Sequence, residues 1–221
     1  MKRILLSSAL LFALAGCASV SDLPRDYTPG AANSEGLAVV SLTLSGKDLG
    51  SVASFEYRVR DAAAQFDADV RRRPYFDSAK QQARWLLDRD AQGPTAARMR
   101  VIVKDQASAE PLDVVEAGKA IGRLAAMRLP PGDYELYAWK VVEPNRYGGN
   151  EFTPKRVFSY PFKVEAGRAT YLGNLDLRMS EQDTYKLSVD DKAARDLALL
   201  SKKLPALRAE QIVHGVGKVL P

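Results

Sequence analysis

Apolar and polar residues alternate with a period of two through much of the chain beyond residue 36. Because neighbouring side chains of a strand point to opposite faces, this alternation predicts strands that are buried on one face. Six runs show it, over residues 38–44, 55–59, 99–103, 134–139, 158–164 and 171–179. Turn residues separate the runs, and no alternation of strands with long helices is visible. The pattern therefore predicts a mainly β domain, an antiparallel sandwich or barrel.

A first helical segment is predicted between the second and third runs. Ser78 and Gln81 have the spacing of a capping box, in which a hydroxyl accepts a backbone N–H three residues later. Small and apolar residues follow, and Gly93-Pro94 ends the pattern. We therefore expect a short helix inserted into the β domain near residues 78–90.

A second helix is predicted after the last run. Asp190 is a candidate N-cap, and apolar residues recur at positions 193, 197, 200 and 204 before Pro205. This stripe is expected to pack against the β domain. The last residues, 212–221, are apolar and contain glycine, so they predict either an additional edge strand or a mobile tail.

The N-terminus has the three parts of an export signal. Met1-Lys2-Arg3 is basic, residues 4–14 are apolar, and Leu14-Ala15-Gly16-Cys17 follows. The apolar run is too short to span a bilayer, which needs about 20 residues. The last four residues resemble the lipobox of bacterial lipoprotein signal peptides. That resemblance implies cleavage before Cys17, a diacylglycerol on its thiol and a further acyl chain, such as palmitate, on its amine. Ala18, by the same resemblance, favours the outer membrane and a domain that faces the periplasm.

These signals divide the chain into four parts. Residues 1–16 are the signal peptide, and residues 17–36 hold the lipidated cysteine and a flexible tether rich in Ser, Pro and Gly. Residues 37–180 form the β-sandwich domain with its helical insertion. Residues 181–221 form the C-terminal helix and tail.

Composition narrows the chemistry. Removing Lys2 and Arg3 with the signal peptide leaves 30 basic against 27 acidic residues, so the net charge falls from +5 to +3, which argues against a nucleic-acid partner. The single Cys excludes a disulfide framework within the chain and a cysteine-based zinc site. The single histidine, His214, has no evident nucleophile near it in sequence. We therefore expect no metal, no cofactor and no catalytic residue.

Two stretches carry a resemblance to a known family. They read GRLAAMRLPPGDYELYAW, residues 122–139, and FSYPFKVEAGRATYLGNLDL, residues 158–177. The repeated order of strand, Pro-Gly turn and strand resembles that of transthyretin-like and carboxypeptidase-regulatory-like β-sandwiches. The resemblance covers residues 120–180 and implies an immunoglobulin-like or transthyretin-like sandwich. It implies no activity, because such folds host unrelated functions.

One cluster of residues suggests a ligand. Arg71, Arg72 and Arg73 precede Tyr75 and Phe76, and guanidinium groups bind phosphate and carboxylate in bidentate fashion. They are candidates for contact with an anionic glycan or another envelope polymer. The simpler interpretation, a solvated basic loop before the inserted helix, is favoured.

The sequence thus predicts a lipid-anchored envelope lipoprotein that faces the periplasm and acts as a non-catalytic binding or structural module. Two alternatives stay open. The first is a hydrolase of envelope polymers whose paired carboxylates are brought together only by the fold. The second is an accessory subunit for secretion or outer-membrane assembly that docks a client protein through a strand edge or through residues 212–221.

Overall fold

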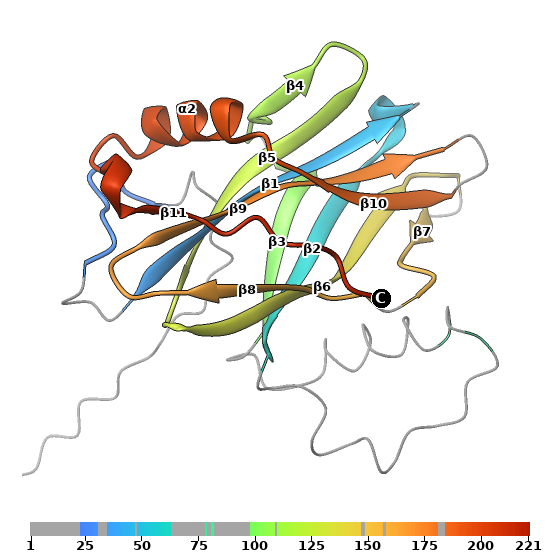
Figure 1. Ribbon diagram of the computed structural model, residues 1–221. Helices are drawn as coiled ribbons and strands as arrows, with labels where there is room; N and C mark the ends of the chain where they lie inside the picture. The colour runs from blue at the N-terminus through green and yellow to red at the C-terminus, as the bar shows by residue number, and fades with distance from the viewer. Residues whose placement is uncertain are drawn as a thin grey trace, which may run out of the picture.

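The protein is mainly β, and its described residues form two sheets that face one another and one helix on the outside of the first sheet (Figure 1). This fold was obtained as a computed structural model. It describes residues 23–30, 35–46, 48–62, 78, 81, 98–108, 110–146, 149–156, 158–180 and 184–221.

The first sheet, sheet A, has the strand order β10-β9-β1-β5-β4, and β11 pairs with the same edge of β9 as β10 does. Its strands are β1 (Gly36–Gly46), β4 (Val114–Glu116), β5 (Ala120–Leu129), β9 (Ala169–Met179), β10 (Tyr185–Asp190) and β11 (Ile212–His214). β1 runs parallel to β9, and so does β11. The expectation of a purely antiparallel fold was therefore wrong, because the chain passes through the other sheet between β1 and β9 and returns in the same direction.

The second sheet, sheet B, is antiparallel, with the order β3-β2-β6-β7 and with β8 also paired to β6. Its strands are β2 (Ser54–Asp61), β3 (Arg98–Asp105), β6 (Gly132–Glu143), β7 (Asn150–Phe152) and β8 (Tyr160–Val164). Short 3₁₀ turns, η3 (Leu49–Ser51) and η7 (Ala209–Gln211), precede β2 and β11.

The main hydrophobic core lies between the two sheets. β1 contributes every second residue to it, Val40 and Leu42 among them, and β2 contributes Phe55 and Tyr57 in the same way. The strand alternation predicted for these two segments is confirmed.

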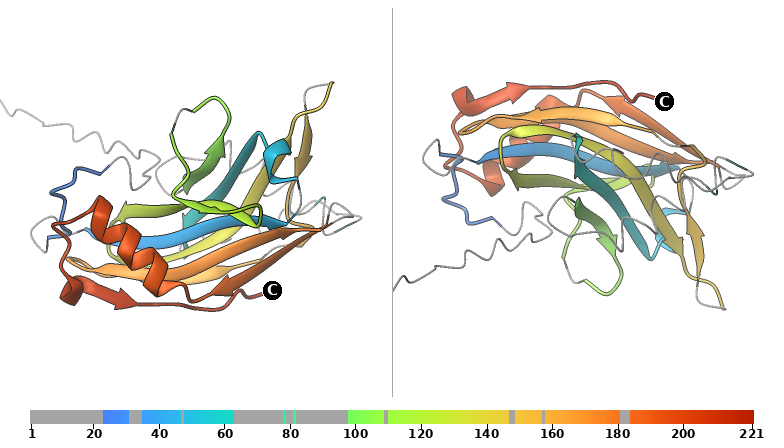
Figure 2. Two further views of the ribbon diagram at one scale, coloured as in Figure 1. Left: turned by 90° about the horizontal axis from the view of Figure 1, so that it is seen from above. Right: turned by 90° about the horizontal axis from the view of Figure 1, so that it is seen from below.

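A second, smaller core lies on the outer face of sheet A, under helix α2 (Ala193–Lys203), which crosses its strands (Figure 2). Leu200 and Leu204 pack there against Leu37 and other outward residues of the sheet, so the predicted apolar stripe is confirmed. The predicted cap was wrong, because Lys192 occupies the N-cap position and its side chain forms no capping hydrogen bond. Asp190 ends β10, and the carboxylate of Asp191 accepts the Ala193 N–H at 2.9 Å.

The N-terminal segment is held against this second core. Leu23 and Tyr27 pack on it, Pro29 is buried, and the Gln211 side chain donates to the Pro29 carbonyl at 3.2 Å. A flexible tether over residues 17–36 is therefore wrong for the part at 23–30, because its apolar side chains find a surface to cover.

The C-terminal segment joins the two sheets. After β11, Gly215 N–H donates to the Tyr171 carbonyl, and Leu220 exchanges two backbone hydrogen bonds with Ser159, at 3.0 and 2.7 Å. Ser159 directly precedes β8 of sheet B, so the segment closes one side of the sandwich. Of the two alternatives for residues 212–221, the edge strand is the one observed.

Several predicted features lie outside the described residues. These are the signal peptide, Cys17, the arginines at 71–73 and most of the helix near 78–90. At the start of that helix, the Gln81 N–H donates to the Ser78 hydroxyl at 3.3 Å, as the capping box predicts. Within the described ranges, no helix has the length and apolarity needed to cross a bilayer.

Candidate binding site

The outer face of β1 changes character halfway along the strand. Leu37 and Val39 are apolar and lie under the C-terminal half of α2, whereas Ser41, Thr43 and Ser45 carry hydroxyls on the same face. Alternate residues of a strand lie on the same side of the sheet, so all five side chains share this outer face. The face is therefore apolar beside the helix and polar farther along the strand.

A β-bulge in β9 supplies the partners of these hydroxyls. Tyr171 lies opposite Val39, but Asn174 lies opposite Ser41, so β9 gains one residue over β1. Gly173 sits in this bulge with φ of 89°, a conformation that favours glycine. The extra residue turns Asn174 outward, and the alternation then continues in the new phase.

A directed chain of hydrogen bonds runs along the polar half of the face. Arg195 Nη2 donates to the Ser41 hydroxyl at 2.7 Å and to Asn174 Oδ1 at 2.8 Å. The Ser41 hydroxyl donates to Asn174 Oδ1, and Asn174 Nδ2 donates to Thr43 Oγ1 at 3.1 Å. The Thr43 hydroxyl in turn donates to Asp176 Oδ1 at 2.7 Å. The Thr43 hydroxyl also lies 3.3 Å from Asn174 Oδ1, but its shorter bond is to Asp176. Along the shorter bonds the donors point from the guanidinium toward the carboxylate, so these bonds polarise one another.

Asp176 is where this chain ends. Its second oxygen, Oδ2, accepts the Ser45 hydroxyl at 2.6 Å. Its carboxylate forms no ion pair with any residue in the described ranges. Since each carboxylate oxygen can accept two hydrogen bonds, Asp176 retains capacity for a further donor.

Helix α2 is fixed over the site by a buried carboxylate. Asp196 is fully buried; it accepts the Tyr171 hydroxyl at 2.8 Å and Arg195 Nε at 2.8 Å. The Lys192 N–H donates to the Tyr171 oxygen at 3.1 Å. Burial, and then the hydrogen bond to Asp196, raise the pKa of Tyr171 far above its usual value, so the phenol stays protonated and donating. These bonds hold the guanidinium of Arg195 at the edge of the polar surface.

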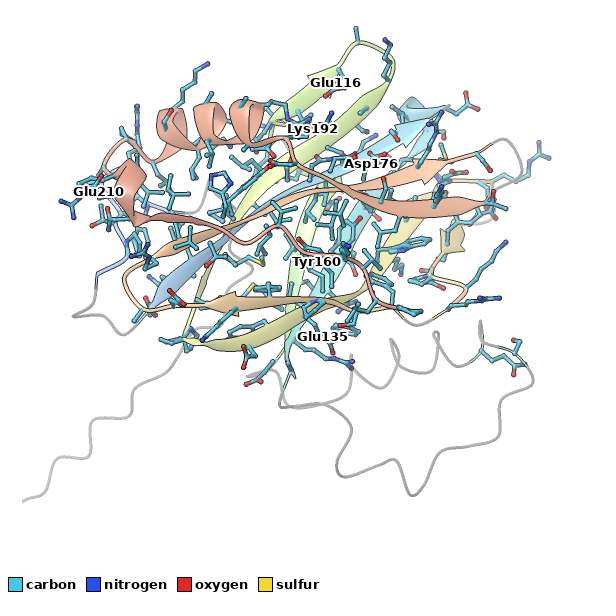
Figure 3. The ribbon with its side chains drawn as sticks, in the orientation of Figure 1. Glu116, Glu135, Tyr160, Asp176, Lys192 and Glu210 are labelled. Atoms are coloured by element: carbon cyan, nitrogen blue, oxygen red, sulfur yellow. The ribbon has the colours of Figure 1, made fainter. Side chains whose placement is uncertain are left out.

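The polar surface is the floor of a cavity of about 550 Å³, which we call the polar pocket. Helix α2 and the β4–β5 hairpin rise on either side of it, and Figure 3 shows Glu116, Asp176 and Lys192 around it. The lining residues are Thr43, Ser45, Gly46, Glu116, Gly118, Lys119, Ala120, Asn174, Asp176, Arg178, Asp190, Lys192 and Arg195.

Charges of both signs line the polar pocket. Arg195 is paired both with Glu116, at 3.0 Å, and with the buried Asp196, at 2.8 Å, so its charge is already compensated. Lys119, Arg178 and Lys192 are exposed at the rim, and none of the three forms an ion pair with a described residue. The pocket therefore offers cationic groups at its rim and an accepting carboxylate on its floor.

The residues singled out from the sequence are not part of this site. His214 is exposed on β11 and meets the Tyr171 ring edge-on at 5.7 Å. Cys17 and the arginines at 71–73 lie outside the described residues. Among the residues that are described, no group of His, Cys, Asp or Glu is arranged to hold a metal ion.

Sequence reasoning missed the pocket although part of its signal was present. The hydroxyls at 41, 43 and 45 alternate with the apolar residues that predicted β1, and Asn174, Asp176 and Arg178 do the same in β9. Such outward polar positions are typical of solvent-facing strands, so the alternation alone did not distinguish a pocket from an exposed surface.

No protein-family model and no curated protein matches the chain. One solved structure is similar to 69% of the chain at 13% identity, with a TM-score of 0.35: a leucine-rich repeat protein from Bacteroides thetaiotaomicron. The matched part is 14% of that protein, so the chain spans about one seventh of its length.

Proposed function

We propose that this protein is a lipid-anchored lipoprotein of the bacterial envelope, held by Cys17 in the outer membrane and facing the periplasm, where it acts as a non-catalytic binding module. The lipobox supports the anchor. The polar pocket is the proposed binding site, and its prebuilt floor is the observation that carries the proposal.

The floor supports binding because its polar groups are already fixed. Thr43 and Asn174 are buried and hydrogen-bonded to each other, and the guanidinium of Arg195 is held by Asp196. Groups that are positioned in advance lose little conformational freedom when a ligand arrives, so more of the interaction energy is retained as affinity. The cavity also falls within the usual size range of small-molecule sites, about 300–1,000 Å³.

For the fold, we propose the finer class that the sequence resemblance implies, an immunoglobulin-like or transthyretin-like sandwich. The shared core between two sheets and the Pro-Gly turn between β5 and β6 are consistent with it. An experimental structure with a different strand order would contradict this assignment.

A hydrolase is the second candidate, because three carboxylates, those of Glu116, Asp176 and Asp190, line one pocket. The Glu116 carboxylate forms an ion pair with Arg195, and the Asp176 carboxylate accepts hydrogen bonds from two hydroxyls. Both groups therefore act as hydrogen-bond acceptors in this structure. Release of soluble fragments from purified envelope polymers, lost in an Asp176→Asn variant, would favour the enzyme over the binding module.

The accessory-subunit alternative is less favoured. The backbones of β11 and Leu220 are already paired with β9 and Ser159, so a client protein would have to displace them. A client could still bind elsewhere, and the arginines at 71–73 stay candidates for an anionic polymer.

The anchor is tested by metabolic labelling with a palmitate analogue, followed by separation of membrane and soluble fractions. We expect a labelled, membrane-bound protein, and an unlabelled, unprocessed one for Cys17→Ser. Ser19→Ala is the matched control and should behave like the unchanged chain. Label on the Cys17→Ser protein would contradict the anchor.

The binding site is tested by nuclear magnetic resonance of the full-length protein as purified from cells. A panel of monosaccharides, amino acids, dipeptides and sugar phosphates is added in turn, and backbone amide shifts are followed. We expect shifts that cluster on Ser45, Glu116 and Lys192, and that need higher ligand concentrations in Arg178→Gln but not in Lys163→Gln, an exposed lysine on sheet B. Shifts confined to other surfaces would contradict the proposed site.

A further inference from the structure

The arrangement of charge in the polar pocket restricts what can bind there. A ligand that carries only negative charge would meet Asp176 on the floor and Asp190 at the side. A ligand that carries only positive charge would meet the rim cations. Neutral sugars are commonly held by aromatic faces, and none of the described lining residues is aromatic.

The floor favours a cationic donor. Asp176 accepts two hydroxyls but forms no ion pair in the described ranges, and the chain of donors that begins at Arg195 ends on it. Neutral hydroxyl donors compensate a carboxylate only partly, whereas an ammonium group forms charge-assisted hydrogen bonds that are about twice as strong. An ammonium is therefore the group that best completes the floor.

The rim favours an anion. Lys119 comes from the β4–β5 turn, Arg178 from β9 and Lys192 from the residue before α2, so three separate elements bring cations to one opening. The position of Lys192 is notable, because a cation at the N-terminus of a helix is opposed by the helix dipole. An anionic group bound there would offset that repulsion and pair with the rim.

We propose that the polar pocket binds a small zwitterion, an amino acid or short peptide with a free ammonium and a free carboxylate. The ammonium contacts Asp176 on the floor, and the carboxylate contacts Arg178 and Lys192 at the rim. This inference rests on the proposed function, since it names the ligand class of the same pocket.

Calorimetric titration with three related probes tests it. The probes are dialanine, N-acetyl-dialanine, which lacks the ammonium, and dialanine amide, which lacks the carboxylate. We expect each blocked probe to bind the full-length protein at least tenfold more weakly than dialanine, because each loses a charge-assisted contact.

Variants separate charge from the size of the blocking groups. In Asp176→Asn, which keeps a similar shape, dialanine and N-acetyl-dialanine should bind within about twofold of each other. In Arg178→Gln, dialanine and dialanine amide should differ less than in the unchanged chain. Lys163→Gln, on the other sheet, should keep the full discrimination. Circular dichroism melting confirms that each variant is folded, and the Arg178 variant, at an exposed position, keeps the test available if Asp176→Asn unfolds.

The outcomes distinguish this inference from the proposed function. Equal binding of all three probes, or absence of dialanine binding while sugars or sugar phosphates shift the pocket resonances, overturns the zwitterion and leaves the binding site standing. Absence of shifts in the pocket with every compound overturns both. Discrimination that survives Asp176→Asn unchanged overturns the assigned role of Asp176.

Discussion

Two fully buried tyrosines in the main core should respond differently to the same substitution. The Tyr160 hydroxyl donates to the Leu172 carbonyl and accepts the Gly217 N–H at 2.8 Å. The Tyr57 hydroxyl is equally buried, but no described residue forms a hydrogen bond with it.

Replacing Tyr160 with Phe removes one donor and one acceptor at once. The Leu172 carbonyl loses a partner, whereas Gly217 is partly exposed and recovers a hydrogen bond from water. An unsatisfied buried group costs about 1–3 kcal/mol, so we expect the free energy of unfolding to fall by about 2 kcal/mol. Replacing Tyr57 with Phe removes a hydroxyl whose unpaired burial costs about 1–3 kcal/mol, so stability should be unchanged or rise by about 1 kcal/mol.

Urea unfolding of the two variants, followed by circular dichroism, measures both changes. For a domain of this size each kcal/mol shifts the melting temperature by about 2–4 °C, so the two variants should melt roughly 4–12 °C apart. A loss of stability in Tyr57→Phe that equals the loss in Tyr160→Phe would refute the reasoning.

The burial of Tyr57 can also be tested through the dependence of stability on alkaline pH. Burial, and then the nearby charge of Asp176, raise the pKa of Tyr57 well above its usual value. Above about pH 10 the unfolded chain loses this proton while the folded chain keeps it, so stability falls as the pH rises. Tyr57→Phe should lose less stability than the unchanged chain between neutral pH and about pH 11, and an identical loss would contradict this assignment.

Three further changes address the elements around the pocket. Gly173→Ala should lower the free energy of unfolding, measured in urea, by more than about 1 kcal/mol. The reason is that φ is 89° and the new Cβ would lie 3.0 Å from the Asp190 carbonyl oxygen. Gly50→Ala, which has open space around its Cβ, is the control and should change stability little. Deleting residues 216–221 removes three hydrogen bonds to β8 and its neighbour and should lower the melting temperature by several degrees; an unchanged melting temperature would show that this segment does not hold the sheets together. Asp196→Ala leaves buried donors without their acceptor and should cost about 3 kcal/mol, with faster hydrogen exchange throughout α2; unchanged exchange there would contradict the anchoring role of Asp196.

The sequence predicted the strands in which apolar residues alternate with polar ones and missed others for identifiable reasons. Each of the six alternating runs corresponds to an observed strand, and helix α2 lies where its apolar stripe places it. β5 shows no alternation because apolar residues occupy both of its faces, with Met127 in the main core and Leu124 in the second core. β4 and β7 are three residues long, too short for a period to be seen.

The polar pocket could not have been predicted in the same way. Its floor depends on β1 and β9 lying side by side although 128 positions separate Gly46 from Asn174, and only tertiary pairing brings them together. The bulge at Gly173 also changes the phase of β9, so a regular strand would direct Asn174 inward and Leu175 outward. A glycine within a strand indicates such a change but does not say where the new face will lie.

The contact between the N-terminal segment and the second core limits how far the domain could stand from a bilayer. Six residue steps separate Cys17 from Leu23, and a fully extended chain of that length reaches about 20 Å. If Cys17 carries its lipid, the surface around Leu23 and Tyr27 stays within about 20 Å of the lipid headgroups. The rotation of the domain relative to the membrane would then be restricted by this short connection. A soluble ligand would approach a protein whose orientation to the membrane is largely set by its own N-terminal residues.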